Sequence, residues 1–117
     1  MKISEIQIFD KSADVNSFKI KGESMWLDKS TRVGLFNSIS IEKNAGKTHT
    51  ILWYDAVKYV IPIPDALPML NEIEMYALNC YNVTQSHIAA VRSLQTIEEI
   101  ENYDYTVGYP VKLSFPG

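Results

Sequence analysis

The sequence contains only one cysteine, Cys80, among its 117 residues. A single cysteine excludes a disulfide within the chain and fits a reducing compartment, although a cysteine-poor extracellular protein would look the same. The two histidines, His49 and His87, do not stand at a metal-ligand spacing from each other or from Cys80. We therefore predict neither a metal site nor any other cofactor.

The sequence also lacks a large excess of charge of one sign and long apolar runs. The formal net charge is −3 and no run of basic residues occurs, which argues against nucleic acid and anionic membranes as partners. No apolar stretch approaches the roughly 20 residues that a membrane-spanning helix requires. The first residues, from Met1 and Lys2 onward, lead directly into charged positions without a secretory signal. We expect a soluble protein made in the cytoplasm.

Apolar residues are plentiful by comparison. They make up 46% of the chain, too many for a disordered protein. A chain of this length typically forms one domain, which buries roughly two-thirds of the surface that its unfolded form exposes. We find no internal repeat, low-complexity segment or linker. The sequence therefore predicts a single domain over residues 1–117.

Apolar residues in the first half recur at a period of two, the spacing of half-buried strands. Ile6 with Ile8, and Phe18 with Ile20, predict two short strands. Residues 32–42 form the most regular pattern, because apolar side chains fall on one face and polar side chains on the other. The apolar positions of that pattern are Val33, Leu35, Ile39 and Ile41.

Two more strands are predicted further along. Residues 48–54 are rich in β-branched and aromatic types. The alternating run over residues 57–63 predicts the other strand, and Pro62 places it at a sheet edge because proline has no N–H for the ladder. The short polar segment 43–47 is interpreted as a hairpin loop between the strands 32–42 and 48–54.

The letters "KNAGKTHT" at residues 43–50 end like a phosphate-binding loop, G-x-x-x-x-G-K-[ST]. That loop requires glycine at its first position, where the backbone approaches the phosphates, and here the residue is Ile41. It also requires a helix directly after its last residue, whose N-terminal amides hold the phosphate. The residues after Thr48 read as strand. We therefore expect no nucleotide binding by this segment.

The second half changes to the helical period of three and four. An apolar stripe predicts a helix over residues 66–94, with Asp65 as its cap and Pro68 in its first turn. A continuous helix would be about 43 Å long, longer than a compact domain of this size is wide. Either the helix breaks near residues 79–84, where helix propensity is poor, or it projects and packs against another surface. The stripe consists of Leu70, Ile73, Ala77, Cys80, Thr84, Ile88, Val91 and Leu94.

Thr96 and Glu99 form a capping-box pattern, which predicts a short C-terminal helix. Residues 111–115 predict a last strand. Together these patterns favour an α+β fold, with a mainly antiparallel sheet of five or six strands packed with one long or broken helix and a short C-terminal helix.

Few residues carry recognisable catalytic chemistry. Cys80 and His87 share a helix face, but the rise between them is about 10 Å, too far for a nucleophile and its base unless the helix breaks. Free cysteine is usually a small buried hydrophobe, and His49 is expected to face solvent. Nothing in the sequence favours a catalytic pair of carboxylates. We expect no enzymatic activity.

Seven tyrosines and two tryptophans are more than a small core readily hides. Aromatic side chains in or beside turns can anchor a protein interface. The alternative is that they fold back and cover the edge of the core. The candidate interface residues are Trp26, Trp53, Tyr76, Tyr81, Tyr103, Tyr105 and Tyr109.

The C-terminal third ends in a distinctive string. A helix, then the generic T-I-E-E capping box, precedes Tyr103-Asp-Tyr-Thr-Val-Gly-Tyr-Pro110, and this arrangement resembles the ends of small proteins encoded among the structural genes of tailed bacteriophages. The resemblance implies a structural or assembly protein of the virion, capsid-decorating or tail-associated, made in the host cytoplasm. Its partners would be other virion proteins or further copies of itself. The alternative is a phage-encoded inhibitor that binds a host protein or sequesters a small ligand.

Overall fold

The computed structural model describes residues 2–116, and these fall into two compact units. Unit 1 combines the residues up to Ser17 with Tyr76–Lys112, and unit 2 combines Phe18–Met75 with the residues from Leu113 onward. The single domain predicted over residues 1–117 stays a prediction.

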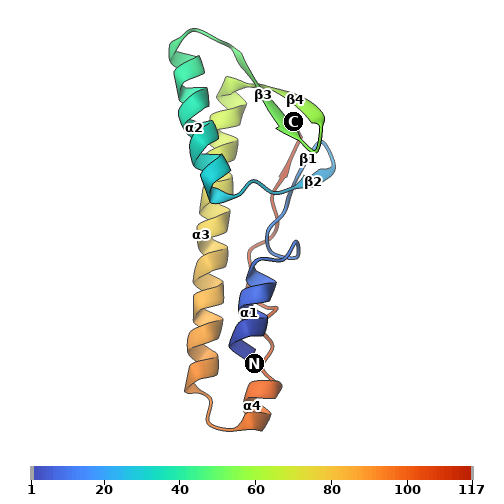
Figure 1. Ribbon diagram of the computed structural model, residues 1–117, viewed down its shortest axis with the longest axis vertical. Helices are drawn as coiled ribbons and strands as arrows, with labels where there is room; N and C mark the ends of the chain where they lie inside the picture. Colours follow the sequence, from blue (N-terminus) through green and yellow to red (C-terminus); the bar gives the residue numbers. More distant parts are fainter. Residues whose placement is uncertain (1, 117) are drawn as a thin grey trace. The chain divides into compact units, whose positions relative to one another are not determined.

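Unit 2 holds all of the strands. Its elements are β1 (Phe18–Ile20), β2 (Glu23–Met25), α2 (Lys29–Asn44), β3 (His49–Tyr54), β4 (Val57–Pro62), the first part of α3 (Ile63–Ser93) and β5 (Ser114–Phe115). One sheet has the order β2-β1-β5, in which β1 pairs antiparallel with β2 and parallel with β5. The other sheet is the antiparallel hairpin β3–β4. Figure 1 shows α2 alongside the first part of α3.

The predicted sheet of five or six strands is wrong. The five short strands form two small sheets instead of one, and the largest predicted strand, residues 32–42, is part of the helix α2. The inward-facing residues of that segment, Arg32, Leu35 and Ile39, are spaced three and four apart, which is the helical period. Val33 and Ile41, assigned to the same face by the strand pattern, are 57% and 61% exposed.

The strand predicted around Ile6 and Ile8 is also wrong, because this segment is the helix α1 (Lys2–Asp10). Ile6 is fully buried, whereas Ile8 is exposed. The residues that pack inward are Ile3, Ile6 and Phe9, at the spacing of three that a helix places on one face. In both segments, apolar residues two positions apart suggested a strand, whereas the residues that pack inward follow the helical spacing of three and four.

The hairpin β3–β4 confirms the strands predicted at residues 48–54 and 57–63, and β1 confirms the strand at Phe18 and Ile20. The two-residue turn of the hairpin, Asp55 and Ala56, has φ values of 50° and 63°. Positive φ at both positions is the type I′ geometry that suits the twist of a hairpin. Pro62 lies on an edge strand, as predicted, because the sheet has only two strands.

Residues 43–47 hold the end of α2, Lys43 and Asn44, and most of the connection to β3, so their interpretation as a hairpin loop between two strands is wrong. The strand expected after Thr48 is confirmed, since β3 begins at His49. The local order is therefore helix, loop, strand. A phosphate-binding loop has the reverse order, with the helix after the loop.

The core of unit 2 lies between the two sheets and α3. The inner face of β3–β4 contributes Leu52, Tyr59 and Ile61, which pack with residues of β1, α2 and α3. Burial of these side chains is the main stabilising term for such a unit. The other buried members are Phe18, Ile20, Met25, Leu27, Ile39, Ile63, Ala66, Met69, Leu70 and Ile73.

The helix α3 is assigned as one helix of 31 residues, without the break considered near residues 79–84. It begins at Ile63, so Asp65 lies in its first turn instead of capping it, and Pro68 lies inside the helix. Its apolar stripe is buried or half-buried along the whole length. Within residues 2–116, no helix combines the length and apolar content needed to cross a membrane.

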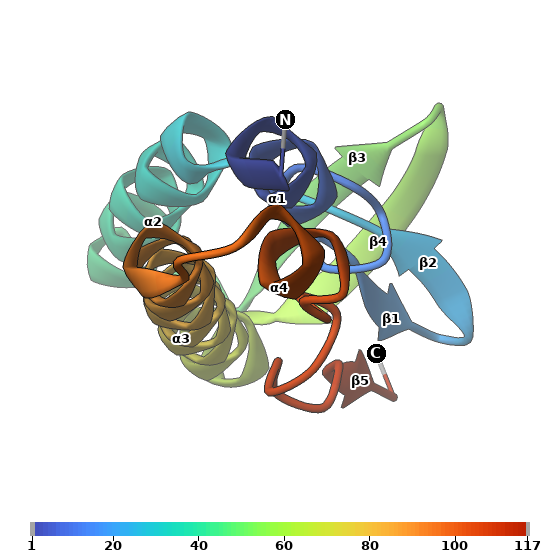
Figure 2. The same cartoon turned by 90° about the horizontal axis from the view of Figure 1, so that it is seen from below.

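Unit 1 consists of α1, the second part of α3 and α4 (Ile97–Glu101), which are viewed end-on in Figure 2. Ile6, Ile88 and Val91 form its apolar cluster. The capping box is confirmed. The Glu99 N–H donates to Thr96 Oγ1 at 3.1 Å, and the Thr96 hydroxyl donates to Glu99 Oε1 at 2.9 Å. The last strand predicted over residues 111–115 is shorter, since β5 covers only Ser114–Phe115.

We predict that Ala56→Gly stabilises the protein by roughly 1 kcal/mol, because glycine adopts positive φ without the steric cost that a Cβ imposes. Thermal or denaturant unfolding measures the change. Ala45→Gly is the matched control, since Ala45 has a φ of −82° and gains nothing from glycine. A loss of stability in Ala56→Gly would contradict the assigned turn geometry.

A second prediction concerns the cap of α2. The Thr31 N–H donates to Asp28 Oδ1 at 2.8 Å, and this bond, with the Thr31 hydroxyl and the Arg32 charge, holds the pKa of Asp28 below its ordinary value of 3.8. A lowered folded-state pKa stabilises the fold above the unfolded value, and this stabilisation is lost as pH falls through the folded value.

The asparagine of an Asp28→Asn variant also caps the helix but does not titrate. Wild type should therefore be more stable than Asp28→Asn at neutral pH, and this difference should disappear as the pH falls below 3.8. Urea unfolding across the acid range measures it. Equal pH dependence of the two proteins would contradict the prediction.

Candidate binding site

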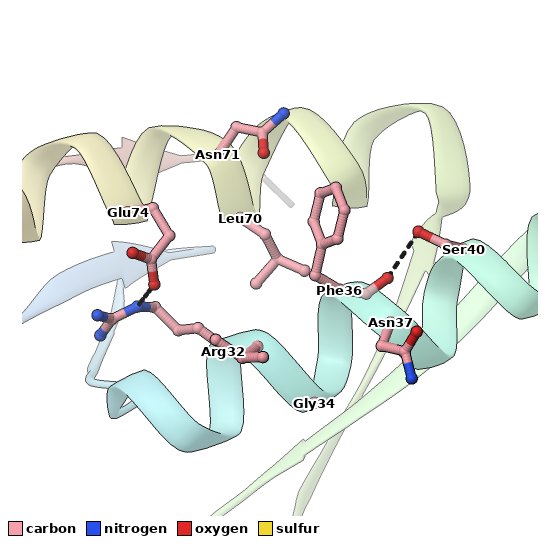
Figure 3. A pocket seen from close by; sticks show the side chains of 9 residues that line it. Arg32, Gly34, Phe36, Asn37, Ser40, Leu70, Asn71 and Glu74 are labelled. Carbon is pink, nitrogen blue, oxygen red and sulfur yellow. Dashed lines mark hydrogen bonds and ion pairs between the residues drawn. The ribbon is translucent and has the colours of Figure 1, made fainter.

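A groove lies between α2 and the first part of α3 in unit 2 (Figure 3). We call it the α2–α3 groove. It has a volume of about 650 Å³, within the range of small-ligand sites. Its lining is Arg32, Val33, Gly34, Phe36, Asn37, Ser40, Leu70, Asn71 and Glu74.

Arg32 joins the two helices at one end of the groove. Its Nε donates to Glu74 Oε1 at 2.5 Å, and its Nη1 donates to the Leu27 carbonyl oxygen at 2.6 Å. The guanidinium carbon lies 5.3 Å from the centre of the Trp26 ring, within cation–π range. Arg32 is buried, whereas the Glu74 side chain is 43% exposed. The ion pair thus fixes α2 against α3 and forms a polar end to the groove.

The middle of the groove is apolar. Figure 3 shows Phe36 of α2 and Leu70 of α3 pointing toward one another. Leu70 is buried, but Phe36 is 42% exposed and Val33 is 57% exposed. The polar rim has the Asn37 and Asn71 amides and Ser40, whose hydroxyl donates to the Phe36 carbonyl oxygen. An apolar floor with a few polar groups is typical of binding sites.

Gly34 lies within α2 and lines this groove. Glycine inside a helix costs roughly 0.5–1 kcal/mol relative to alanine. Some glycines are needed because a Cβ would collide with a neighbour, but a Cβ at Gly34 would meet no atom within 4 Å. Its φ is not in the left-handed region either. Neither packing nor backbone geometry within unit 2 therefore requires glycine here.

A second hollow adjoins the groove and shares Asn71 with it. We call it the basic hollow. Its volume is about 580 Å³. Lys43, Lys47 and His49 line it, and no acidic side chain does, although the chain as a whole carries −3. Lys47 Nζ is 3.7 Å from Glu42 Oε2 and remains largely exposed. The remaining lining residues are Thr48, Pro62, Ile63, Pro64, Leu67 and Pro68.

Four of the seven candidate interface residues make hydrogen bonds or ring contacts within unit 1. The Tyr76 hydroxyl donates to the Val15 carbonyl oxygen at 2.7 Å. Tyr103 OH lies 2.7 Å from His87 Nδ1, and Tyr109 OH lies 2.7 Å from Thr84 Oγ1. Tyr105 and Tyr109 each make an edge-to-face contact with the Phe9 ring. These four tyrosines fit the alternative given for the aromatic residues, in which they fold back and cover the core.

The other three candidates differ in exposure. Tyr81 is 55% exposed and Trp53 is 62% exposed. Trp26 is half-buried, between Arg32 and Phe18. Tyr81 belongs to unit 1, whereas both tryptophans belong to unit 2. A shared interface of all seven residues stays a prediction, and only Tyr81 and Trp53 present most of their side chain to solvent.

Cys80 and His87 have separate surroundings. Cys80 is buried, and burial raises the pKa of its thiol, with a smaller lowering by the Tyr76 hydroxyl and a raising by Asp10. His87 Nε2 donates to the Val107 carbonyl oxygen at 2.8 Å, while Nδ1 faces Tyr103 OH. A buried thiol with a raised pKa is a poor nucleophile. Both ring nitrogens of His87 are engaged elsewhere, so this geometry does not support a Cys–His pair.

His49 is exposed, as expected. Within the described residues, no group of three or more histidine, cysteine or acidic side chains could hold a metal ion.

The sequence analysis does not predict the α2–α3 groove, because it assigns residues 32–42 to a strand. The signal that could have located it was Asp28 before Lys29-Ser30-Thr31, a helix N-cap pattern, with a glycine inside the helix that it begins.

No protein-family model matches the chain, and neither the curated proteins nor the solved structures contain a significant match.

We predict that Gly34→Ala raises the free energy of unfolding by roughly 0.5–1 kcal/mol, because the new Cβ enters open space and removes the entropic cost of glycine. Urea unfolding measures this change. Gly46→Ala is the contrasting control, since Gly46 has a φ of 85° and should lose stability. A destabilised Gly34→Ala would show that the fold itself requires the glycine.

Proposed function

We propose that this chain is a non-enzymatic binding protein that holds a segment of another protein in the α2–α3 groove. The observation that supports this most is Gly34. This glycine lowers the stability of the helix, and packing does not require it. Its role is explained if the missing side chain leaves room for a bound segment. The exposed Phe36 and Val33 beside it would bury apolar surface on binding.

The adjoining basic hollow indicates the chemistry of the occupant. Lys43, Lys47 and His49 lie beside an apolar groove with no acidic side chain in the same hollow. A segment with apolar side chains over Phe36 and Leu70 and an acidic group over the lysines would be complementary to both parts. Charge complementarity of this kind contributes mainly to specificity and to the rate of association.

We further propose that the partner belongs to a tailed-phage particle, so that the protein serves in the structure or assembly of the virion, on the capsid or the tail. This setting rests on the resemblance of residues 103–110 to the ends of phage structural-cassette proteins. Two tyrosines of that string, Tyr103 and Tyr109, make hydrogen bonds within unit 1. The string would then preserve the fold of such proteins, while binding uses unit 2.

A phage-encoded inhibitor that sequesters a small ligand is the second candidate. The volume of the groove, about 650 Å³, supports it, because ligand pockets span roughly 300–1,000 Å³. Such a protein would be absent from particles. An assembly protein would be present in many copies.

The test is quantitative mass spectrometry of purified particles of the phage that encodes the chain. We expect the wild-type protein in many copies per particle. Gly34→Leu, which fills the groove, should be lost from particles while circular dichroism and melting show a folded protein. Ser38→Leu is the matched control, since Ser38 is an exposed residue of α2 that does not line the groove, and it should be retained.

Absence of the wild-type protein from particles would contradict the virion setting. Retention of Gly34→Leu at wild-type levels would instead contradict binding through the groove. Charge reversal of the basic hollow, Lys43→Glu with Lys47→Glu, should weaken incorporation, and the loss should be larger at low salt because screening is weaker there.

A further inference from the structure

The strand β3 has an open edge. Among residues 2–116 its only ladder partner is β4, with Thr50 opposite Ile61 and Leu52 opposite Tyr59. The Ile63 N–H donates to the Thr48 carbonyl oxygen at 2.9 Å. Because directly opposed residues alternate between hydrogen-bonded and non-hydrogen-bonded pairs, Thr50 and Leu52 bond to β4.

The intervening residues therefore point their backbone groups the other way. The N–H and C=O groups of His49, Ile51 and Trp53 face the free edge of β3. Among residues 2–116, no backbone hydrogen bond from another segment reaches them. An edge of this kind is a template for a further strand.

The two edges of the hairpin are not equally protected. The outer edge of β4 has Lys58 and Pro62, and both a lysine and a proline discourage pairing with another chain. The strand β3 is His-Thr-Ile-Leu-Trp-Tyr and contains no charged residue and no proline. It also has no bulge, since its residues pair one-to-one with β4.

The solvent face of the same hairpin is apolar. Trp53 is 62% exposed, Ile51 is 49% exposed, and Val60, directly opposite Ile51, is 47% exposed. Exposed apolar side chains on an unprotected edge strand are characteristic of an interaction surface.

We propose that two copies of this chain pair through β3, antiparallel, about a two-fold axis at Ile51. Ile51 then lies opposite the partner's Ile51, and Trp53 lies opposite the partner's His49. The backbone groups of His49, Ile51 and Trp53 all face the free edge of β3. The Ile51–Ile51 and Trp53–His49 pairs are therefore hydrogen-bonded pairs. The product is a four-stranded sheet of order β4-β3-β3-β4, a common sheet size.

A second copy fits this edge for reasons that the strand itself supplies. Antiparallel pairing of β3 with itself places no like charges opposite each other, because the strand has none. The two Ile51 side chains cover one another, and each Trp53 packs beside a histidine ring. Cross-strand aromatic and β-branched pairs of this type stabilise sheets. A two-fold arrangement satisfies both edges at once and leaves no further β3 edge for a third copy.

The test uses the prediction that Ile51 lies on the axis. Size exclusion with light scattering should give wild type a mass twice the 13.3 kDa of one chain. Ile51→Lys and Ile51→Glu each bring two like charges together, so each variant alone should be a monomer. An equimolar mixture of the two should form a dimer, since opposite charges then meet across the axis. Ile51 is half exposed, so both variants should fold, which circular dichroism checks.

Val60→Lys and Val60→Glu are the matched controls, because Val60 is equally exposed on the same face but lies on β4. Both should remain dimers. A monomeric wild type at the highest attainable concentration, a dimeric Ile51→Lys, or a mixture that fails to associate would each overturn the proposal. Monomeric Val60 variants would also overturn it, by showing association through the hairpin face instead of the β3 edge.

Discussion

The polar contacts of the buried Arg32 guanidinium fix α2 against α3 in unit 2. The guanidinium bonds to a carboxylate on α3 and to the Leu27 carbonyl oxygen before α2, and it lies over the Trp26 ring. A buried arginine is tolerated only when its donors are paired. Removal of Glu74 would therefore leave a buried charge unpaired. These contacts decide where α2 crosses α3, and the α2–α3 groove is a consequence of that crossing.

Unit 1 depends on a different set of polar contacts. Thr84 on α3 donates to Asp10 of α1 and also contacts the Tyr109 hydroxyl, while His87 contacts Tyr103 and Val107. These bonds hold a segment with little regular structure against α3. Within the described residues, no buried side-chain polar atom lacks a hydrogen-bond partner, as expected for a stable interior. The tyrosine-rich segment is thereby a structural part of unit 1, and its aromatic rings are largely engaged there.

The apolar stripe predicted over residues 66–94 does not form an exposed surface. A long helix with an exposed stripe would favour association, but Ile88 and Val91 of that stripe are buried. In unit 2, Val33 and Phe36 are exposed in the α2–α3 groove, and Ile51, Trp53 and Val60 are exposed on the solvent face of β3–β4, besides Ile41 and Met75 on the helices. The α2–α3 groove presents side chains to a partner, whereas the edge of β3 presents backbone N–H and C=O groups. Two separate interactions can therefore coexist on one small unit, one with a partner protein and one with a second copy.

The sequence by itself determined those elements whose signals are local. The helix period of residues 66–94, the Thr96 capping box and the strands β3 and β4 were all predicted, because caps, turns and long periodic runs act over a few residues. For residues 32–42 the apolar pattern favoured a strand, and the local Asp28 cap together with a tertiary contact decided for a helix. Apolar side chains at Val33, Leu35, Ile39 and Ile41 fit a strand, yet the helix prevails because Asp28 caps it and Arg32 reaches Glu74, 42 residues further along. The groove shares this dependence, since no local pattern relates Gly34 and Phe36 to Leu70 and Asn71 on another helix.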